Sequence, residues 1–244
     1  MIGPLTRVST RILPLLSGAF VSSDGHLRKS ARILSRTKRN DMLFFHHVAR
    51  WSRDDGDVKL RLNYPELKED SVIFDLGGYK GQFTSDIFAK YGSEIYVFEP
   101  FQTFFQSLQE RFQSNRRIRV FDFGLAGRDE TQRIYFHDDG TSVFRPSTNF
   151  QEIRIRRFSS FVQQHNIAAI DLLKVNIEGS EYDLLDDIID AGLQHRIRNI
   201  QVQFHRDIVH AYERMEHIKQ TLLMSHYLTY EYPFVWENYR LKSS

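Results

Sequence analysis

The chain contains no cysteine, which excludes disulfides, thiolate zinc sites and a cysteine nucleophile. It also lacks a run of the roughly 18 apolar residues that a membrane-spanning helix needs; the longest apolar-rich stretch, residues 12–21, is interrupted by Pro14, Ser17 and Gly18. Its net charge is small, since 33 Lys and Arg residues against 31 Asp and Glu leave +2, which excludes a uniformly basic coat for nucleic acid. The 41% hydrophobic and 14% aromatic residues among 244 predict a globular protein with a sizeable core.

The charge is unevenly distributed along the chain. Residues 1–40 contain eight Lys and Arg residues and one acid, Asp24, so this segment carries +7 and leaves −5 for residues 41–244. Three roles fit such a segment: a helical extension packed on the body, a surface that docks on anionic lipid or a polyanionic substrate, or a cleaved targeting sequence. We predict a basic helical N-terminal extension over residues 1–62 and one larger domain over residues 63–244.

Short apolar runs alternate with helical patterns from residue 71 onward. Strands are predicted at residues 72–76, 95–98 and 118–123, and helices at 82–91 and 101–112. After a predicted hairpin around Asp139-Gly140, helices are expected at 159–165, 181–191 and 209–224, and strands at 171–177, 200–204, 227–232 and 235–241. A further helix is expected near residues 43–51. This order predicts an α/β fold with a doubly wound, mostly parallel seven-stranded sheet that ends in an antiparallel C-terminal hairpin.

Glycines follow the first predicted strand, in the segment DLGGYKG at residues 75–81. Gly77, Gly78 and Gly81 allow the backbone to approach a ligand, and the following helix presents free N–H groups to anionic parts of it. In an open α/β sheet, ligands bind beyond the carboxyl ends of the strands. Tyr79 occupies the place of the second glycine of the dinucleotide fingerprint, and the triphosphate-binding pattern is also missing. The alternative interpretation is a glycine-rich turn without a ligand.

An acidic residue, Glu99, ends the second predicted strand, 24 residues after Asp75. A carboxylate at this position can accept hydrogen bonds from both hydroxyls of a ribose. Alternatively, Glu99 and Pro100 suit the first turn of the following helix. Together with the glycine segment, Glu99 predicts a nucleoside-containing ligand that lies across the first two strands.

Polar residues gather at the ends of two later strands. If residues 173–177 form a strand, Lys174, Asn176 and Glu178 share one side of it. Period 2 likewise places His205 with two glutamines at the end of the strand that begins near residue 200. A histidine that titrates near neutrality can accept a proton. Against these functional interpretations, the acidic residues could simply favour the next helix N-terminus, and the histidine could be structural.

Five segments together resemble the FkbM family of S-adenosylmethionine-dependent methyltransferases: VIFDLGGYKG, VFEP, FGLAG, LLKVNIEGSEYDLL and QVQFH, between about residues 71 and 204. The resemblance implies a Rossmann-like methyltransferase fold over residues 63–244 and S-adenosylmethionine as cofactor. The sequence as a whole is most similar to family members found with bacterial surface-polysaccharide genes, which implies O-methylation of a sugar hydroxyl.

The resemblance also assigns roles to residues. It implies that Glu99, followed by Pro100, holds the ribose, that Gly124 and Leu125 line the adenine pocket, and that the methionine end is held by Asp75 and the segment of Gly77, Gly78, Tyr79 and Gly81. His205 is expected to act as base, with Glu178 and Asn176 orienting it or the acceptor, and Lys174 is expected to be structural, paired with Glu178.

Two positions depart from the family pattern. Asn176 stands where Asp is common, and Gln203 where Glu is frequent. An amide is neither a base nor a strong metal ligand, so we expect no metal. Alternatives are O- or N-methylation of another small molecule, and a catalytically silent protein with the same fold. A glycan acceptor, no nucleic acid, a cytoplasmic location and contact of residues 1–40 with anionic membrane complete the expectations.

Overall fold

The computed structural model describes residues 40–137, 140–142 and 150–243. The greater part of the predicted N-terminal extension, residues 1–39, therefore lies outside the described residues. Residues 43–244 form one compact unit. The segment 43–62, which the sequence assigned to the extension, belongs to this unit. Trp51, in a helix whose described residues are 40–53, packs edge-on against Tyr232 of the C-terminal hairpin, with ring centroids 5.1 Å apart.

The unit is built on a seven-stranded sheet in the order β10-β11-β9-β8-β1-β2-β3. Its parallel strands are β1 (Val72–Leu76), β2 (Glu94–Phe98), β3 (Ile118–Phe121), β8 (Leu172–Val175) and β9 (Asn199–Val202). Strand β11 (Trp236–Leu241) pairs antiparallel with both β9 and β10 (His226–Tyr232). The predicted fold class, a mostly parallel sheet with an antiparallel C-terminal hairpin, is confirmed.

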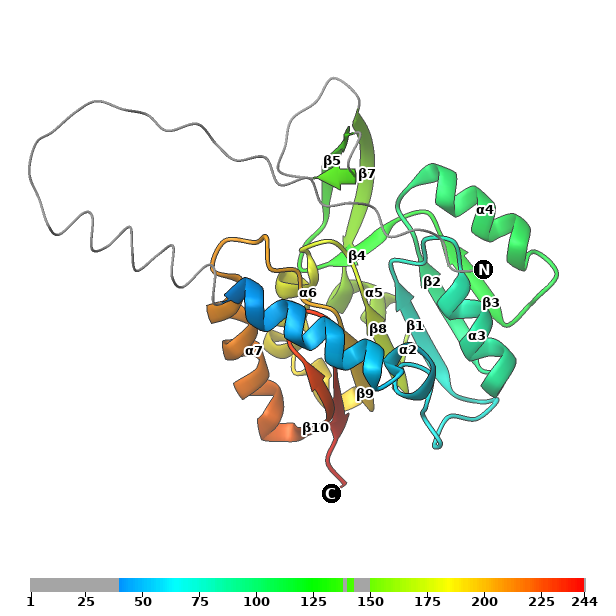
Figure 1. Ribbon diagram of the computed structural model, residues 1–244. Coiled ribbons are helices and arrows are strands. Elements are labelled where there is room, and N and C mark those ends of the chain that lie inside the picture. The colour runs from blue at the N-terminus through cyan, green and yellow to red at the C-terminus, as the bar shows by residue number, and fades with distance from the viewer. Residues whose placement is uncertain (1–39, 138–139, 143–149, 244) are drawn as a thin grey trace, which may run out of the picture. The chain divides into compact units, whose positions relative to one another are not determined.

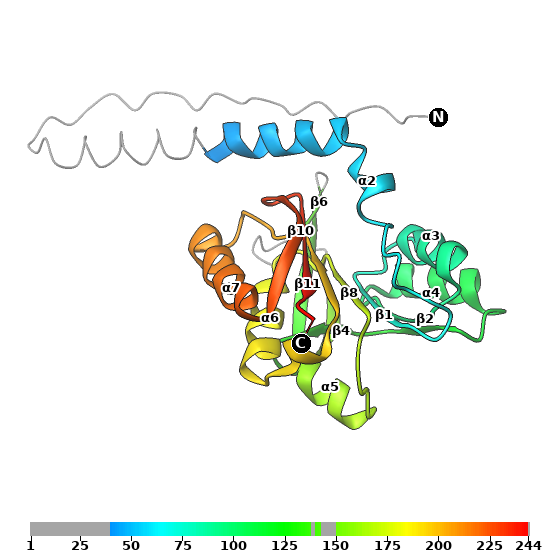
Figure 2. The ribbon, with the colours of Figure 1, turned by 90° about the horizontal axis from the view of Figure 1, so that it is seen from below.

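Helices cover both faces of this sheet (Figure 2). One face carries α3 (Gln82–Tyr91) and α4 (Gln102–Phe112); the other carries α5 (Phe158–Gln164), α6 (Glu181–Asp190) and α7 (Ala211–Ser225). The alternation of β-strand side chains divides the core accordingly. Phe74 and Leu76 belong to the cluster beneath α5, α6 and α7, whereas Ile73 belongs to the cluster beneath α3 and α4. The central strands are therefore buried on both faces, as is usual for parallel strands, although β1, β8 and β9 also carry the buried polar residues Asp75, Lys174 and Gln201.

A second sheet has the order β4-β7-β5-β6 and comprises β4 (Gly124–Ala126), β7 (Phe150–Arg157), β5 (Glu130–His137) and β6 (Gly140–Ser142). The expected hairpin exists, since β5 and β6 pair antiparallel. Strands β4 and β7 were not expected, and the third predicted strand, residues 118–123, ends earlier, at Phe121. In Figure 1 the small sheet projects beyond one end of the large one, and β7 and β5 contribute residues to the cavity described next.

Short connections complete the description of the unit. Helix α2 (Gly56–Lys59) follows the first helix, and a 3-10 turn, η1 (Leu193–Arg196), precedes β9. Gly56 allows the close packing of this segment, because a Cβ atom there would lie 2.3 Å from the Trp51 ring. No helix in the part of the chain that the structure describes is both long and apolar enough to cross a membrane.

Candidate active site

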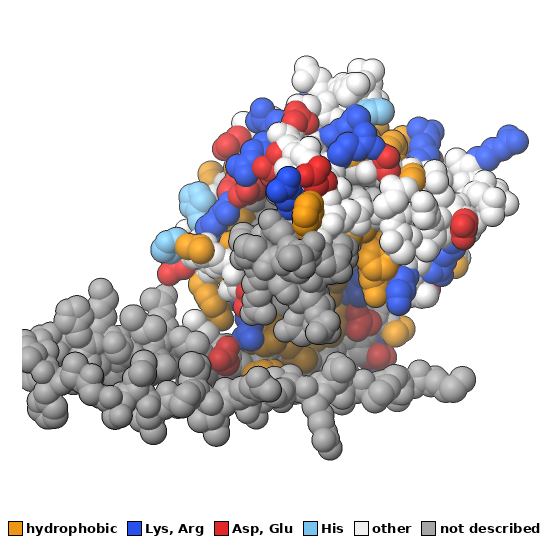
Figure 3. Space-filling view, turned by 90° about the horizontal axis from the view of Figure 1, so that it is seen from above, with side chains coloured by type: hydrophobic (Ala, Val, Ile, Leu, Met, Phe, Trp, Pro, Cys, Tyr) orange, Lys and Arg blue, Asp and Glu red, His pale blue; other side chains and the backbone are white. Residues whose placement is uncertain are grey.

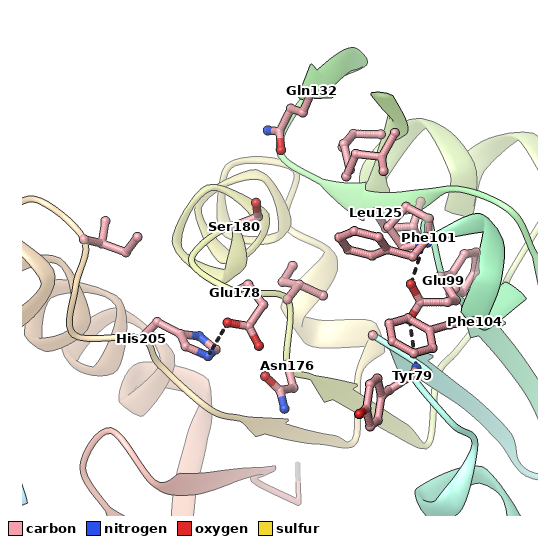
Figure 4. Close-up of a pocket in the computed structure, with 18 of the residues that line it drawn as sticks. Tyr79, Glu99, Phe101, Phe104, Leu125, Gln132, Asn176, Glu178, Ser180 and His205 are labelled. Atoms are coloured by element: carbon pink, nitrogen blue, oxygen red, sulfur yellow. Dashed lines mark hydrogen bonds and ion pairs between the residues drawn. The ribbon is translucent and has the colours of Figure 1, made fainter. Parts of the chain in front are cut away.

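A cavity of about 610 Å³ lies at the carboxyl end of the parallel strands (Figure 4). This is the position at which open α/β sheets bind their ligands. Residues predicted from the sequence to form the site line the cavity at nine positions: Gly77, Tyr79, Glu99, Pro100, Gly124, Leu125, Asn176, Glu178 and His205. Three other predicted residues, Asp75, Gly78 and Gly81, do not line it.

The walls of the cavity differ in chemistry. Tyr79, Glu99, Phe101 and Phe104 lie together on one side in Figure 4, and His205 lies on the other side with its neighbouring acids. Further apolar side chains come from Ile153 and Ile155 of β7, and the segment after β9 adds the acid Asp207 and the apolar Ile208. A flat aromatic or heterocyclic group is suited to the first wall, and a polar group to the second.

The loop between β1 and α3 is fixed by backbone contacts at Gly77. Its φ angle is +81°, and a Cβ atom there would lie 2.0 Å from the carbonyl oxygen of Asn176, so only glycine fits. Gly78 and Gly81 serve packing instead: Cβ atoms at these positions would meet Val97 at 2.4 Å and Leu108 at 2.7 Å. The prediction that all three glycines approach a ligand is therefore corrected for Gly78 and Gly81, which face the helical layer.

Asp75 is fully buried beneath this loop and does not reach the cavity. Its Oδ1 forms an ion pair of 2.8 Å with Lys174 Nζ, and its Oδ2 accepts a hydrogen bond of 2.6 Å from Thr84. Lys174 also donates to the carbonyl oxygens of Leu76 and Gly77 at 3.3 and 2.9 Å. The expected pairing of Lys174 with Glu178 is therefore wrong, and Asp75 supports the loop from behind.

Glu99 joins the loop between β1 and α3 to the segment that follows β2. Its Oε2 accepts a hydrogen bond of 2.8 Å from the backbone N–H of Tyr79, and its Oε1 accepts one of 2.9 Å from Phe101. Burial raises the pKa of Glu99, and the two backbone hydrogen bonds oppose this rise. A carboxylate oxygen has more than one acceptor position, so Glu99 retains capacity for two hydroxyl donors from the cavity.

Two residues that line the cavity have a left-handed backbone although neither is glycine. Tyr79 has a φ angle of 49° and Glu178 one of 53°. Such conformations cost about 1–3 kcal/mol each and persist where the surroundings impose them. They turn the Tyr79 ring toward Phe104, at 4.5 Å between centroids, and place the Glu178 carboxylate beside His205.

His205 lies between two carboxylates. Its Nδ1 is 3.1 Å from Oε1 of the buried Glu181, and its Nε2 is 3.5 Å from Oε2 of the exposed Glu178. Burial alone would lower the pKa of His205, but the hydrogen bond and charge of Glu181, with the charges of Glu178 and Asp207, outweigh burial and raise this pKa above its ordinary value. The site thus holds an imidazole that can carry and release a proton at the cavity surface.

The sequence argument missed Glu181 and Asp207 as parts of the site. The first stands three residues after Glu178, in the same acidic segment, and was attributed only to the helix N-terminus; the second follows His205 by two residues. The expected grouping of His205 with Gln201 is not found. Strand β9 ends at Val202, and the Gln201 amide is buried elsewhere, donating to Tyr64 and Tyr230 hydroxyls and to the Arg61 carbonyl.

The arrangement fits an adenosyl cofactor. Gly77 and Gly124 bring backbone to the cavity wall, since a Cβ atom at Gly124 would lie 2.8 Å from Ile155. Glu99 offers its remaining acceptor positions, and Oδ1 of Asn176 is buried without a hydrogen-bond partner among the described residues. An unsatisfied buried acceptor at a cavity wall is the signature of a missing donor group. Among the described residues, there is no group of three or more Asp, Glu or His side chains that could hold a metal ion.

Comparisons with known proteins agree with this geometry. The family model described as Methyltransferase FkbM domain matches residues 75–232, well over half of the chain. The curated relative "Methyltransferase 1" of Beauveria bassiana (strain ARSEF 2860) is 26% identical over 149 residues, 50% of this chain and 60% of that protein, so the chain spans about 60% of this relative's length.

Two solved structures give weaker similarities. One is a putative rRNA-methylase from Clostridium thermocellum, with a TM-score of 0.46, 9% identity, and coverage of 73% of this chain and 90% of that one. The other is fibrillarin from Aeropyrum pernix with bound S-adenosyl-L-methionine, with a TM-score of 0.43, 11% identity, and coverage of 73% and 69%. The family match decides the assignment: the chain belongs to the FkbM family of methyltransferases, and its cofactor is S-adenosylmethionine.

Proposed function

We propose that the protein is an O-methyltransferase that methylates a hydroxyl group of a sugar, in a surface polysaccharide or its precursor. The observation that carries this proposal is the position of His205, whose Nε2 faces a cavity that also contains Glu99 and the loop at Gly77. A proton acceptor and a nucleoside-binding carboxylate thus share one cavity. This is the minimum that methyl transfer from S-adenosylmethionine to a hydroxyl requires.

The residues on the aromatic side of the cavity would hold the cofactor. Glu99 would accept hydrogen bonds from the ribose hydroxyls, and the backbone at Gly77 and Tyr79 would contact the methionine end. Pro100, Gly124 and Leu125 would border the adenine; together with the others, they line the cavity. When bound, S-adenosylmethionine supplies a methyl group made electrophilic by its sulfonium.

His205 would remove the proton of the acceptor hydroxyl. It can do so only as the neutral imidazole, and the neighbouring carboxylates that raise its pKa make the imidazole a stronger base while moving the appearance of the neutral form to higher pH. Proton acceptance by a positioned side chain typically contributes about 10²- to 10⁴-fold to the rate. Glu178, with a carboxylate exposed at the cavity, and Asn176, with an unpartnered Oδ1, would orient the acceptor.

The charge of the lining supports a neutral or cationic acceptor. Glu99, Glu178 and Asp207 contribute carboxylates, and no Lys or Arg is among the described residues that line the cavity. Among the described residues visible in Figure 3, Lys and Arg side chains are interspersed with Asp and Glu and form no continuous basic track of the kind that binds nucleic acid. A polyhydroxyl acceptor suits such a lining, because carboxylates accept hydroxyl hydrogen bonds. We also propose a cytoplasmic location and no nucleic-acid partner.

Other interpretations of the same cavity are distinguishable. An amine acceptor also suits acidic walls, so N-methylation is the second candidate. A catalytically silent protein would bind the cofactor but transfer no methyl group. Contact of residues 1–40 with anionic membrane falls largely on residues outside the described ones and stays a prediction from their charge.

Calorimetry tests the cofactor assignment at Glu99. Glu99→Gln should weaken binding of S-adenosylhomocysteine by about 10- to 100-fold, because hydrogen bonds to a charged group contribute about 1.5–3 kcal/mol. Glu94→Gln is the matched control, since Glu94 begins the same strand at the opposite end and pairs with Arg119 on the surface. Unchanged affinity in Glu99→Gln would refute the assignment.

A panel of neutral, acidic and amino sugars tests the reaction, with transfer of a labelled methyl group as the readout. His205→Gln should reduce turnover by about 10²-fold or more and leave cofactor affinity unchanged. His195→Gln, at an exposed histidine of η1, is the control. Full activity of His205→Gln across the pH range would remove His205 from the reaction, and cofactor binding without product from any acceptor would favour a silent protein.

A further inference from the structure

The carboxylate of Glu181 is a fully buried charged group beside the cavity. It begins helix α6, has a side-chain exposure of 0%, and is not part of the cavity lining. Its two oxygens are both used. Oε1 accepts hydrogen bonds from the backbone N–H of His205 at 2.7 Å and contacts Nδ1 of the same residue at 3.1 Å, while Oε2 accepts one of 2.8 Å from the backbone N–H of Gly179.

We propose that Glu181 is a positioning residue for the reaction: it holds the ring of His205 in the form that carries hydrogen on Nδ1 and presents the Nε2 lone pair to the acceptor hydroxyl. The inference rests on the proposed function, because it assigns how His205 is prepared for its role. Glu181 itself touches neither cofactor nor acceptor. Its effect passes through His205.

The chemistry of a carboxylate determines which nitrogen carries the hydrogen. An ionised carboxylate only accepts hydrogen bonds, so Nδ1 of His205 must be the donor in this contact. The neutral imidazole has one hydrogen, so its Nε2 is then an acceptor. The N-terminus of α6, where Glu181 stands, stabilises the ionised carboxylate through the helix dipole. The same oxygen binds the ring and the main chain of His205, so the ring cannot turn without breaking this arrangement.

A second contact fixes the main chain of the same residue. The hydroxyl of Tyr182, the next residue of α6, donates a hydrogen bond of 2.8 Å to the carbonyl oxygen of His205. Side chains of helix α6 thus hold both the N–H and the carbonyl of His205, which lies in the segment between β9 and α7. Two adjacent helix residues therefore determine where His205 stands and which way its ring faces.

The Nε2 side of the His205 ring faces a more exposed carboxylate than the Nδ1 side does. Nε2 lies 3.5 Å from Oε2 of Glu178, whose side chain is 68% exposed, and Asp207 is a third acid near the ring. The imidazolium form pairs with Glu178. In the neutral form the Nε2 lone pair faces that carboxylate without a hydrogen between them, and an acceptor hydroxyl placed there supplies one. Proton transfer then breaks the O–H bond of the acceptor, forms N–H at Nε2, and leaves the oxygen electron pair for the methyl carbon.

Nuclear magnetic resonance of the protein with ¹⁵N-labelled histidine tests the inference without any assay of activity. The neutral ring of His205 in the unaltered protein should be protonated at Nδ1, and its pKa should lie above the ordinary value of a histidine. A neutral ring protonated at Nε2 in the unaltered protein would overturn the inference, whatever any variant does.

Glu181→Gln supplies the functional arm. One amide oxygen cannot accept from both Gly179 and His205, so the amide NH2 group opposes one of these N–H donors. The His205 ring then loses its partner or keeps a neutral oxygen in place of a charged one. We expect kcat to fall about 10²- to 10⁴-fold with cofactor affinity unchanged, as for loss of the correct histidine tautomer. We also expect the pKa of His205, and with it the acidic limb of kcat/KM, to move to lower pH, because the charge of Glu181 raises that pKa.

Asp183→Asn is the matched control, since Asp183 lies in the same helical turn but pairs with Arg214 on the surface. An unchanged tautomer, pKa and kcat in Glu181→Gln would overturn the inference. If His205→Gln were fully active while the tautomer of His205 still depended on Glu181, the proposed function would fail and the structural link would stand. If His205 were essential but indifferent to Glu181, only the present inference would fail.

Discussion

Replacing Lys174 by methionine tests how much the buried ion pair between Asp75 and Lys174 contributes to stability. This pair lies beneath the loop between β1 and α3. The Lys174 side chain is 4% exposed and that of Asp75 0%, and 2.8 Å separates their charged atoms. Methionine has a similar length and removes the charge together with the hydrogen bonds to the Leu76 and Gly77 carbonyls. Asp75 is then left as a buried carboxylate with Thr84 as its remaining hydrogen-bond donor among the described residues.

The magnitude follows from the burial of both partners. Breaking a buried pair by removing one charge costs about 3–5 kcal/mol, because the other charge is left uncompensated. A domain of ordinary stability has about 5–15 kcal/mol in total, so Lys174→Met should be close to the limit of folding. The double variant Asp75→Asn with Lys174→Met removes the stranded charge as well. It should recover at least about 2 kcal/mol and retain only the loss of the carbonyl contacts.

Urea unfolding of the two single variants and the double variant measures this coupling, and calorimetry with S-adenosylhomocysteine measures the loop. The double variant should fold but bind the cofactor more weakly than the unaltered protein, because the carbonyls of Leu76 and Gly77 lose the donor that fixes them. Additive losses in the three variants would refute the reasoning. So would a Lys174→Met variant as stable as the unaltered protein.

Three further changes follow from single contacts. Gly77→Ala should abolish cofactor binding while the rest of the sheet stays folded, because its Cβ would lie 2.0 Å from the Asn176 carbonyl; normal calorimetric affinity would contradict this. Burial raises the pKa of Glu237 to about 7 from 4.5, so the folded state holds this proton more tightly and stability falls as pH rises through this range. In Glu237→Gln, the free energy of unfolding measured with urea should fall by roughly 3 kcal/mol less between pH 5 and pH 8 than in the unaltered protein. An unchanged pH dependence would contradict this prediction. Burial also raises the pKa of Glu99, and ribose donors favour its ionised form, so cofactor binding should release protons and tighten as pH rises through that pKa; calorimetry in two buffers would show no proton release if this is wrong.

The sequence predicts the large sheet because its signal is local. Consecutive apolar residues such as Ile73 and Phe74 point to opposite faces of a strand and are both buried, and helical patterns separate these short runs. The small sheet was only half predicted, although β7 alternates Ile153 and Ile155 with arginines. That alternation is typical of a strand with one buried face, but its partner β4 has three residues and leaves no pattern of its own.

The sequence indicated where in the fold the candidate site lies, but it indicated the contacts between the site residues less well. Polar side chains at the ends of predicted strands indicate the carboxyl edge of the sheet, and Glu99 and His205, which were selected on this basis, both line the cavity. The partners were not found, since Asp75 and Lys174 are 99 residues apart and Glu181 and His205 are 24 apart. Alternation also fails as a guide to side-chain direction once a strand ends, as β8 does at Val175 before Asn176.

The buried acids at this edge of the sheet each hold another part of the chain. Asp75 holds Lys174, Glu99 holds two backbone N–H groups, and Glu181 holds His205. Of these three acids, only Glu99 also lines the cavity. Asp75 and Glu181 therefore act through the residues that they position, whereas Glu99 both holds the backbone and faces the cavity. Loss of activity on replacing such an acid is consequently evidence of contact only when cofactor affinity falls while stability is retained. A changed tautomer or pKa of His205 with unchanged cofactor affinity is evidence that the acid positions another residue.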